Sequence, residues 1–211
     1  MNTIKNLILD LGGVLFDLDY ELTRQAFFKL GLGDNFSKLK QSSLFDDIEE
    51  GKVSPTDFYS TLIKSSTNHL PPTIQELKDA WNLMLLGMKS TQLDLLLQLK
   101  EQYRLFLYSN TNAIHIQAVW ESLQLHHGIK NLDDYFNKVY LSHELEIRKP
   151  KPAGFLHIVS EHNLIKAETL FIDDSPQHVK GAKEAGIHAL YLDLEKQDLK
   201  SLLIESNLLD D

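Results

Sequence analysis

The chain has 211 residues, enough for one compact domain with an accessory segment but few for two full-sized domains. With 43% hydrophobic and 24% charged residues, its composition excludes a disordered or fibrous protein. A formal net charge of −9 without a basic stripe argues against nucleic-acid binding, and the absence of cysteine excludes disulfides, thiolate nucleophiles and cysteine-based metal sites.

The first predicted element is a buried strand at residues 4–9, a short run rich in branched apolar side chains. It ends at Asp10, and the pair Gly12 and Gly13 indicates a tight loop directly after it. A carboxylate in this place can serve a reaction, or it can be a solvated acid in a sharp turn. This segment alone does not decide between the two.

Residues 18–88 read as helices without a strand between them. The helical patterns cover residues 20–30, 36–49, 55–66 and 73–86. The simplest account is an all-helical insertion placed after the first strand.

The remainder of the chain alternates strands with helices. Strand patterns recur at residues 104–108, 138–141, 169–172 and, more weakly, 188–192. Helical patterns occur at residues 92–102, 113–124, 153–163 and 177–186, the last with Gly186 as its cap. This alternation predicts a parallel, doubly wound sheet with helices on both faces. Ligands of such sheets bind beyond the carboxyl ends of the strands.

Polar segments follow the predicted strands at these ends. They are Asp10 to Asp17, Ser109 to Asn112, Arg148 to Pro152, and Asp173 to Pro176. Together they resemble the four motifs of the haloacid dehalogenase-like superfamily, in the same order and over nearly the whole chain. The sequences of these motifs are most similar to the branch that contains glucose-1-phosphate phosphatases. They read Asp-Leu-Gly-Gly-Val, Ser-Asn-Thr-Asn, Arg-Lys-Pro and Asp-Asp.

The resemblance implies an α/β protein whose Rossmann-like core carries an inserted helical cap. The core would comprise residues 1–17 and 89–211, and the cap residues 18–88. This division agrees with the independent reading of the insertion as all-helical.

The resemblance also implies a phosphatase acting on a small phosphorylated metabolite, such as a sugar phosphate. Asp10 would be the nucleophile and would form an aspartyl-phosphate intermediate. Lys149 would offset the repulsion between this carboxylate and the phosphate. The Ser109 hydroxyl and the Asn110 backbone amide would hold phosphate oxygens, where negative charge spreads in the transition state.

Magnesium is the cofactor that this resemblance implies, because a hard cation prefers oxygen ligands. Asp10, Asp174 and the backbone carbonyl of Gly12 would be ligands, with Asp173 as a further ligand or an orienting group. The candidates for substrate contact in the cap are Phe45, Glu49, Lys52 and Trp81.

Gly12 departs from the family pattern, which usually has an aspartate general acid two residues after the nucleophile. General acids typically contribute ~10² to 10⁴ in rate, so three readings stay open. The first is a phosphatase that takes its acid from the cap or favours activated leaving groups. The others are a metal-independent 2-haloacid dehalogenase, against which the pair Asp173 and Asp174 argues, and a non-catalytic relative that binds a phosphate ligand.

No apolar stretch approaches the ~20 residues that a helix needs to span a bilayer. The amino terminus runs from Met1 to Lys5 straight into the first strand, which is not the pattern of a secretory signal. The absence of cysteine fits a reducing compartment. We therefore expect a cytoplasmic protein without a membrane or nucleic-acid partner.

Overall fold

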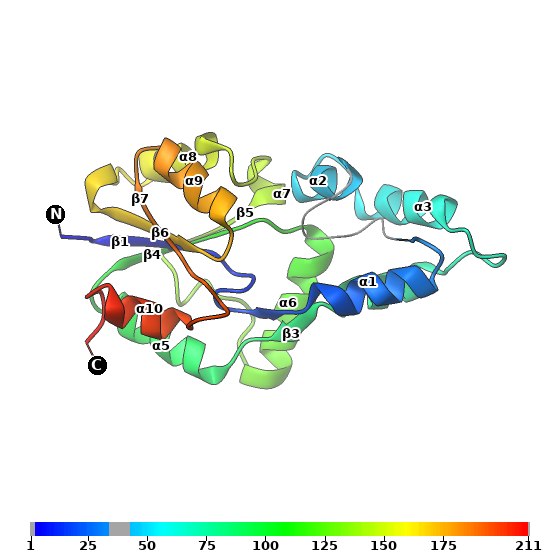
Figure 1. The fold of residues 1–211 in the computed structure, drawn as a ribbon, viewed down its shortest axis with the longest axis horizontal. Helices are drawn as coiled ribbons and strands as arrows, with labels where there is room; N and C mark the ends of the chain where they lie inside the picture. The colour runs from blue at the N-terminus through cyan, green and yellow to red at the C-terminus, as the bar shows by residue number, and fades with distance from the viewer. Residues whose placement is uncertain (1–2, 34–42, 211) are drawn as a thin grey trace.

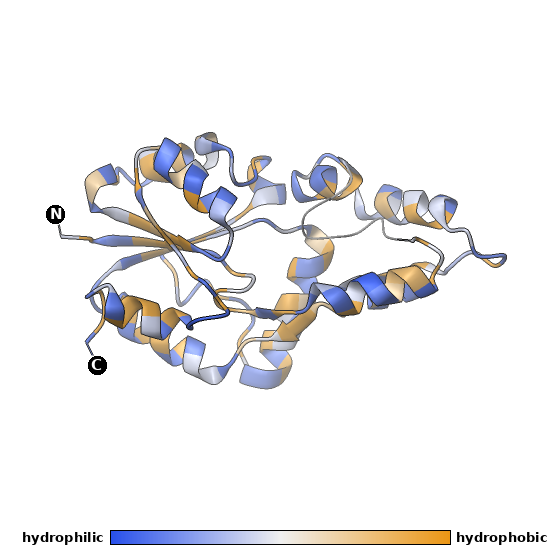
Figure 2. Ribbon diagram, in the orientation of Figure 1, coloured by the Kyte–Doolittle hydropathy of each residue, from blue (hydrophilic) through white to orange (hydrophobic). Residues whose placement is uncertain are grey.

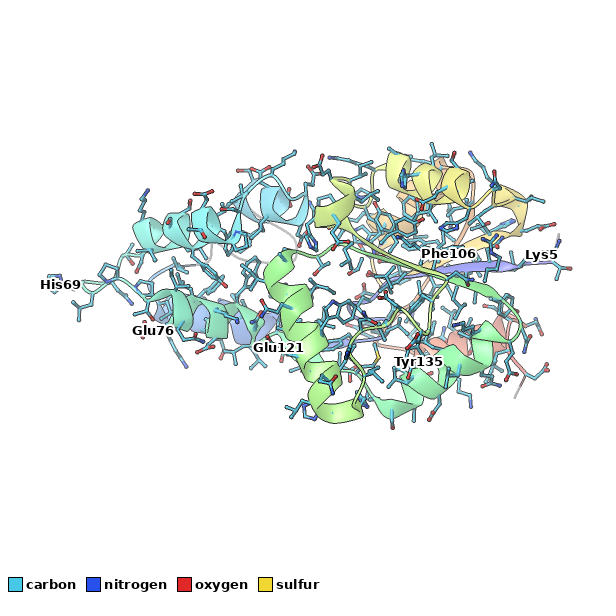
Figure 3. The ribbon with its side chains drawn as sticks, turned by 180° about the vertical axis from the view of Figure 1, so that it is seen from behind. Lys5, His69, Glu76, Phe106, Glu121 and Tyr135 are labelled. Carbon is cyan, nitrogen blue, oxygen red and sulfur yellow. The ribbon has the colours of Figure 1, made fainter. Side chains whose placement is uncertain are left out.

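The computed structural model describes residues 3–33 and 43–210 and shows an elongated molecule with two parts (Figure 1). A sheet with helices on both sides forms one part, and a group of helices forms the other. Lys5, directly before the first strand, and His69 in the cap lie at opposite ends of the molecule (Figure 3).

The core sheet has five parallel strands in the order β5-β4-β1-β6-β7. These are β1 (Asn6–Leu9), β4 (Arg104–Ser109), β5 (Lys138–Leu141), β6 (Thr169–Asp173) and β7 (His188–Tyr191). On the central strand, Leu7 and Leu9 pack into the apolar cluster on one face and Ile8 into the cluster on the other. A strand buried on both faces reads as an unbroken apolar run, and all five predicted strands are confirmed.

Helices cover both faces of the sheet (Figure 1). On one face lie α8 (Pro152–Glu161) and α9 (Pro176–Glu184), and on the other α5 (Ser90–Lys100), α6 (Ala113–His127) and α10 (Leu199–Glu205). Their orange stripes in Figure 2 face the sheet, as amphipathic helices require. Two of the helices, α7 (Ser142–Leu145) and α10, were not predicted. None of the helices within the described residues has the length and apolar character needed to cross a membrane.

The cap is helical and has an aromatic core of its own. It contains α1 (Tyr20–Lys29), α2 (Ser43–Glu49), α3 (Pro55–Ser65) and α4 (Ile74–Asn82). Side chains of Asp19, Ser54 and Thr73 cap α1, α3 and α4 by accepting backbone N–H bonds, which satisfies donors that have no partner within the helix. Residues 36–42 of the second predicted helix lie outside the described residues.

Two short strands join the cap to the core. Neither strand was predicted, and the predicted end of the last cap helix is wrong. β2 (Asp17–Leu18) pairs antiparallel with β3 (Leu85–Gly87), whereas residues 18–88 were expected to lack strands and a helix was expected to run to residue 86. The helix α4 ends at Asn82. The residues that follow, Leu83 to Leu86, are all apolar. Such a run shows neither the period of a helix nor the alternation of a strand, so its pattern does not distinguish the two.

Candidate active site

The carboxyl ends of the core strands open into a cavity of about 130 Å³ between the sheet and the cap. Residues from all four predicted motifs line it together: Asp10, Gly12, Ser109, Asn110, Arg148 and Asp174. The cap closes it with Tyr20, Phe45, Glu49 and Trp81, and helix α6 contributes His115. The sheet topology therefore brings together segments that lie more than 160 residues apart in the chain.

Lys149 lies beside this cavity, and its side chain is not exposed to solvent. Its Nζ is 2.7 Å from Asp10 Oδ1 and 2.7 Å from Asp173 Oδ2. The rings of Tyr108 and Phe171 lie within 5.6 Å and 5.3 Å of the same nitrogen. One buried cation thus joins the ends of β1 and β6.

Burial raises the pKa of Asp10 well above its ordinary value, and Asp173 adds to this effect while Lys149 opposes it. Burial also acts against ionisation of Asp173, but Lys149 and His178 outweigh it and hold the pKa of Asp173 far below the usual range. Burial lowers the pKa of Lys149, but the two carboxylates overcome this effect and raise it. The site therefore keeps Lys149 and Asp173 charged, and a further cation would favour the ionised form of Asp10.

Asp173 orients Lys149 and is itself held by two more donors. Its Oδ1 accepts the backbone N–H of Ser175 at 2.7 Å, and His178 Nδ1 lies 3.0 Å from both carboxylate oxygens. The contact of His178 with Asp173 was not predicted from the sequence. The only signal was a histidine five residues after an aspartate at a strand end, at the start of a predicted helix.

The carboxylates offer oxygen ligands of the kind that magnesium takes. Ligand atoms of Asp10, Asp173 and His178 lie within 4.8 Å of one another, and Asp174 lines the same cavity. His178 Nδ1 is occupied by Asp173, so this side chain suits orientation of the acid better than metal binding. Gly13, with φ +81°, leaves room for Asp174, since a Cβ here would lie 2.5 Å from Asp174 Oδ2. The Gly12 carbonyl as a ligand stays a prediction.

Asn110 holds the loop that carries Lys149. Its Nδ2 donates to the Lys149 carbonyl at 2.9 Å, and its Oδ1 accepts the Lys149 N–H at 2.8 Å. The side chain of Asn110 thus positions Lys149, and the role of its backbone amide in holding an anion stays a prediction. Ser109 is buried and lines the cavity, and the contact of its hydroxyl with phosphate stays a prediction.

Three of the four cap candidates, Phe45, Glu49 and Trp81, line the cavity. Lys52 does not: it is more than half exposed, and its Nζ lies 2.6 Å from Glu50 Oε2. A surface ion pair satisfies this lysine, so the expectation that Lys52 contacts the substrate is wrong for this arrangement of the cap.

The two cations that flank Lys149 attach the cap to the core. Arg148 Nη2 lies 2.9 Å from Glu49 Oε2, and Lys151 pairs with Glu50. Because Glu49 ends α2 and Glu50 follows it, this helix docks on the same loop that positions Lys149.

The sequence model of the haloacid dehalogenase-like hydrolase family matches residues 4–186 of this chain. A D-ribitol-5-phosphate phosphatase of Bacteroides thetaiotaomicron is 36% identical over 186 residues, which is 87% of this chain and 89% of the relative. A sesquiterpene phosphatase of Aspergillus oryzae is 27% identical over 90% of both chains.

Solved structures agree with these matches. A haloacid dehalogenase family enzyme of Bacteroides thetaiotaomicron has a TM-score of 0.84 and 33% identity, covering 96% of this chain and 99% of its own. That enzyme was solved with magnesium and inorganic phosphate, both as wild type and as an aspartate-to-alanine variant. A predicted hydrolase of Porphyromonas gingivalis, with a TM-score of 0.84 and 31% identity, matches over 99% of both chains.

The buried ion triad predicts a large effect of removing its cation. We expect Lys149→Met to lower the free energy of unfolding by about 3–5 kcal/mol at pH 7 without magnesium, because Asp10 and Asp173 are left buried and unpaired. The variant raises the folded-state pKa of these carboxyls, so their destabilising effect starts at the unfolded-state pKa of about 4, grows with pH, and is complete above the raised folded-state pKa. The loss should therefore shrink as the pH falls towards 4. Urea unfolding at both pH values measures it.

The matched control is Lys151→Met, on the same loop but in a half-exposed ion pair with Glu50. It should cost less than about 1 kcal/mol. Equal losses for the two variants would show that Lys149 does not carry the energetic role assigned to it.

Proposed function

The chain belongs to the haloacid dehalogenase-like hydrolase family, and on this basis we propose that it is a magnesium-dependent phosphatase acting through an aspartyl-phosphate on Asp10. Its substrate would be a small sugar or sugar-alcohol phosphate. The observation that carries the proposal is the contact of Asp10 with the buried Lys149, at the floor of a cavity that the cap closes.

In the first step, an oxygen of Asp10 forms a bond to phosphorus while the bond from phosphorus to the ester oxygen breaks. The electron pair of that bond goes to the leaving oxygen. Lys149 offsets the charge of the attacking carboxylate, and the Ser109 hydroxyl and Asn110 backbone amide stabilise the phosphate oxygens. Magnesium, held by Asp10 and Asp174 with help from Asp173, would neutralise further phosphate charge.

In the second step, water attacks the phosphorus of the aspartyl-phosphate. The bond between phosphorus and the Asp10 oxygen breaks, so inorganic phosphate leaves and the carboxylate is restored. Splitting the hydrolysis in this way replaces one difficult displacement with two easier ones.

The more similar of the two curated relatives supports a small, polar substrate. One relative is a phosphatase of D-ribitol 5-phosphate, a five-carbon sugar-alcohol ester. The sesquiterpene phosphatase is less similar, and a terpene would require apolar walls. In this chain, the described cavity walls combine apolar side chains such as Phe45 and Met84 with the polar side chains of Tyr20, Glu49 and His115, so groups that can bind hydroxyls are present.

The structure gives a physical reason for glycine at position 12. A Cβ at Gly12 would lie 2.6 Å from Leu18 Cδ1, so the linker to the cap occupies the space where a side chain would begin. Among nearby described groups, burial lowers the pKa of His115 to about 4 and raises the pKa of Tyr20 far above its ordinary value. At neutral pH neither matches the pKa of an efficient general acid. The leaving oxygen should therefore depart with much of its negative charge.

The nucleophile assignment predicts that Asp10→Asn abolishes magnesium-dependent phosphatase activity, with at least a 10³-fold loss, because an amide oxygen is a poor nucleophile. Hydrolysis of 4-nitrophenyl phosphate and of ribitol 5-phosphate, each with and without excess chelator, measures the loss and the metal requirement.

Asp17→Asn serves as the control, since Asp17 is an acid on the linker that pairs with Lys89 outside the cavity. It should keep activity within about threefold of the parent. Substantial turnover by Asp10→Asn, or undiminished parent turnover in chelator, would contradict the proposed mechanism.

The glycine at position 12 predicts a steep dependence of rate on the acidity of the leaving group. Aryl phosphates and sugar 1-phosphates should form the phosphoenzyme faster than primary alkyl phosphates, because they stabilise the departing oxygen better. Rapid-quench measurement of phosphoenzyme formation across a series of esters gives the slope. A flat series would mean that another residue donates the proton, and Glu49 would be the next to test.

A further inference from the structure

We propose, resting on the phosphatase function above, that His115 and Trp81 form a hydrogen-bonding site for hydroxyl groups of the leaving alcohol. This site would select an uncharged, polyhydroxylated substrate ester over alkyl esters and over substrates with a second anionic group. His115 and Trp81 line the same cavity as Asp10, and each carries a buried polar atom that lacks a protein partner; this juxtaposition carries the inference.

His115 reaches the cavity from the core side. It lies in the first turn of α6, the helix that stands between the sheet and the cap in Figures 1 and 3. Its ring centroid is 4.4 Å from that of Trp81, and its Nε2 is buried and has no partner. The Trp81 backbone raises the pKa of the ring, as a nearby carbonyl oxygen does. Since Nε2 has no partner, we assign the hydrogen of the neutral ring to Nδ1, facing this carbonyl.

The free Nε2 of this neutral imidazole is a hydrogen-bond acceptor. Burial lowers the pKa of His115 to about 4, so the ring is uncharged at neutral pH. A buried acceptor without a partner destabilises the folded protein, because the atom has lost its hydrogen bonds to water and gained none in return. A substrate hydroxyl would supply the missing donor.

Trp81 offers the complementary group. Its side chain is 2% exposed, and its Nε1–H is buried without a partner. The ring is fixed by stacking on Phe58, with centroids 4.1 Å apart, and by an edge contact with Phe45. A rigid donor beside a rigid acceptor can bind hydroxyls with little loss of side-chain freedom.

The charges on the cap side disfavour a second anionic group on the substrate. Glu49 and Arg148 both line the cavity, and Arg148 pairs with Asp46 as well as with Glu49. These three groups sum to one negative charge when all are ionised. The guanidinium is already committed to carboxylates, so a carboxylate or second phosphate on the leaving group would meet net repulsion.

The test uses the full chain with magnesium and compares kcat/KM for ribitol 5-phosphate, pentyl phosphate and 4-nitrophenyl phosphate. Two histidine variants separate the roles of the ring nitrogens. Asparagine places its amide near the Nδ1 position, keeping the backbone contact, whereas glutamine places its amide near Nε2. The third variant is Trp81→Phe, which keeps the ring but removes the donor.

We expect His115→Asn and Trp81→Phe each to reduce kcat/KM for ribitol 5-phosphate about tenfold more than that for 4-nitrophenyl phosphate. His115→Gln should restore most of the selectivity. The controls His126→Asn and Trp120→Phe, on α6 but outside the cavity lining, should leave the ratio unchanged. Parent enzyme should prefer ribitol 5-phosphate to pentyl phosphate by at least about 100-fold, which tests the site even if a variant fails to fold.

Equal losses on both substrates, or an asparagine variant as selective as the glutamine variant, would give these residues a structural role only and overturn the inference. Equal hydrolysis of pentyl and ribitol phosphates by the parent would also overturn it. Failure of the proposed function looks different, because the parent would then hydrolyse none of the three esters.

Discussion

The contact of one buried lysine with two buried carboxylates is the constraint on which the rest of the site depends. Lys149 has no solvent to stabilise its charge, so Asp10 and Asp173 must stay within 2.7 Å of it. This requirement explains why Asn110 binds the Lys149 backbone on both sides and why His178 and a backbone amide hold Asp173. The result is that the core holds Asp10, the proposed nucleophile, in place through Lys149.

The same loop links this arrangement to the cap. Arg148 and Lys151, on either side of Lys149, pair with acids at the end of α2, and the side chain of Leu18 fills the space beside Gly12. Sheet, loop and cap linker therefore meet around one small cavity. Its floor carries groups suited to phosphate, and its walls carry groups suited to the alcohol. In the proposed function, the floor of the cavity therefore carries out the reaction, and its walls select the substrate.

Much of the site could be predicted from the sequence because parallel strands bring their carboxyl ends to one edge. Asp10, Lys149 and Asp174 follow buried strands or occur in recognisable motifs, so the topology alone gathers them. The partner of a side chain is set by the folded structure and not by a sequence pattern, which is why the contact of His178 with Asp173 was not predicted and Lys52 was assigned to the cavity. The linker strand β3 was missed for another reason: it begins within a run of apolar residues, which shows no periodicity.

The most direct test of this account is the site of covalent phosphorylation. A reaction of the parent enzyme with magnesium and 4-nitrophenyl phosphate, quenched in acid within one turnover, should yield an acid-stable, base-labile acyl phosphate. Peptide mass spectrometry should place it on Asp10. Phosphate on another residue, or rapid turnover with no phosphorylated protein in the quenched sample, would contradict the assignment of Asp10 as nucleophile.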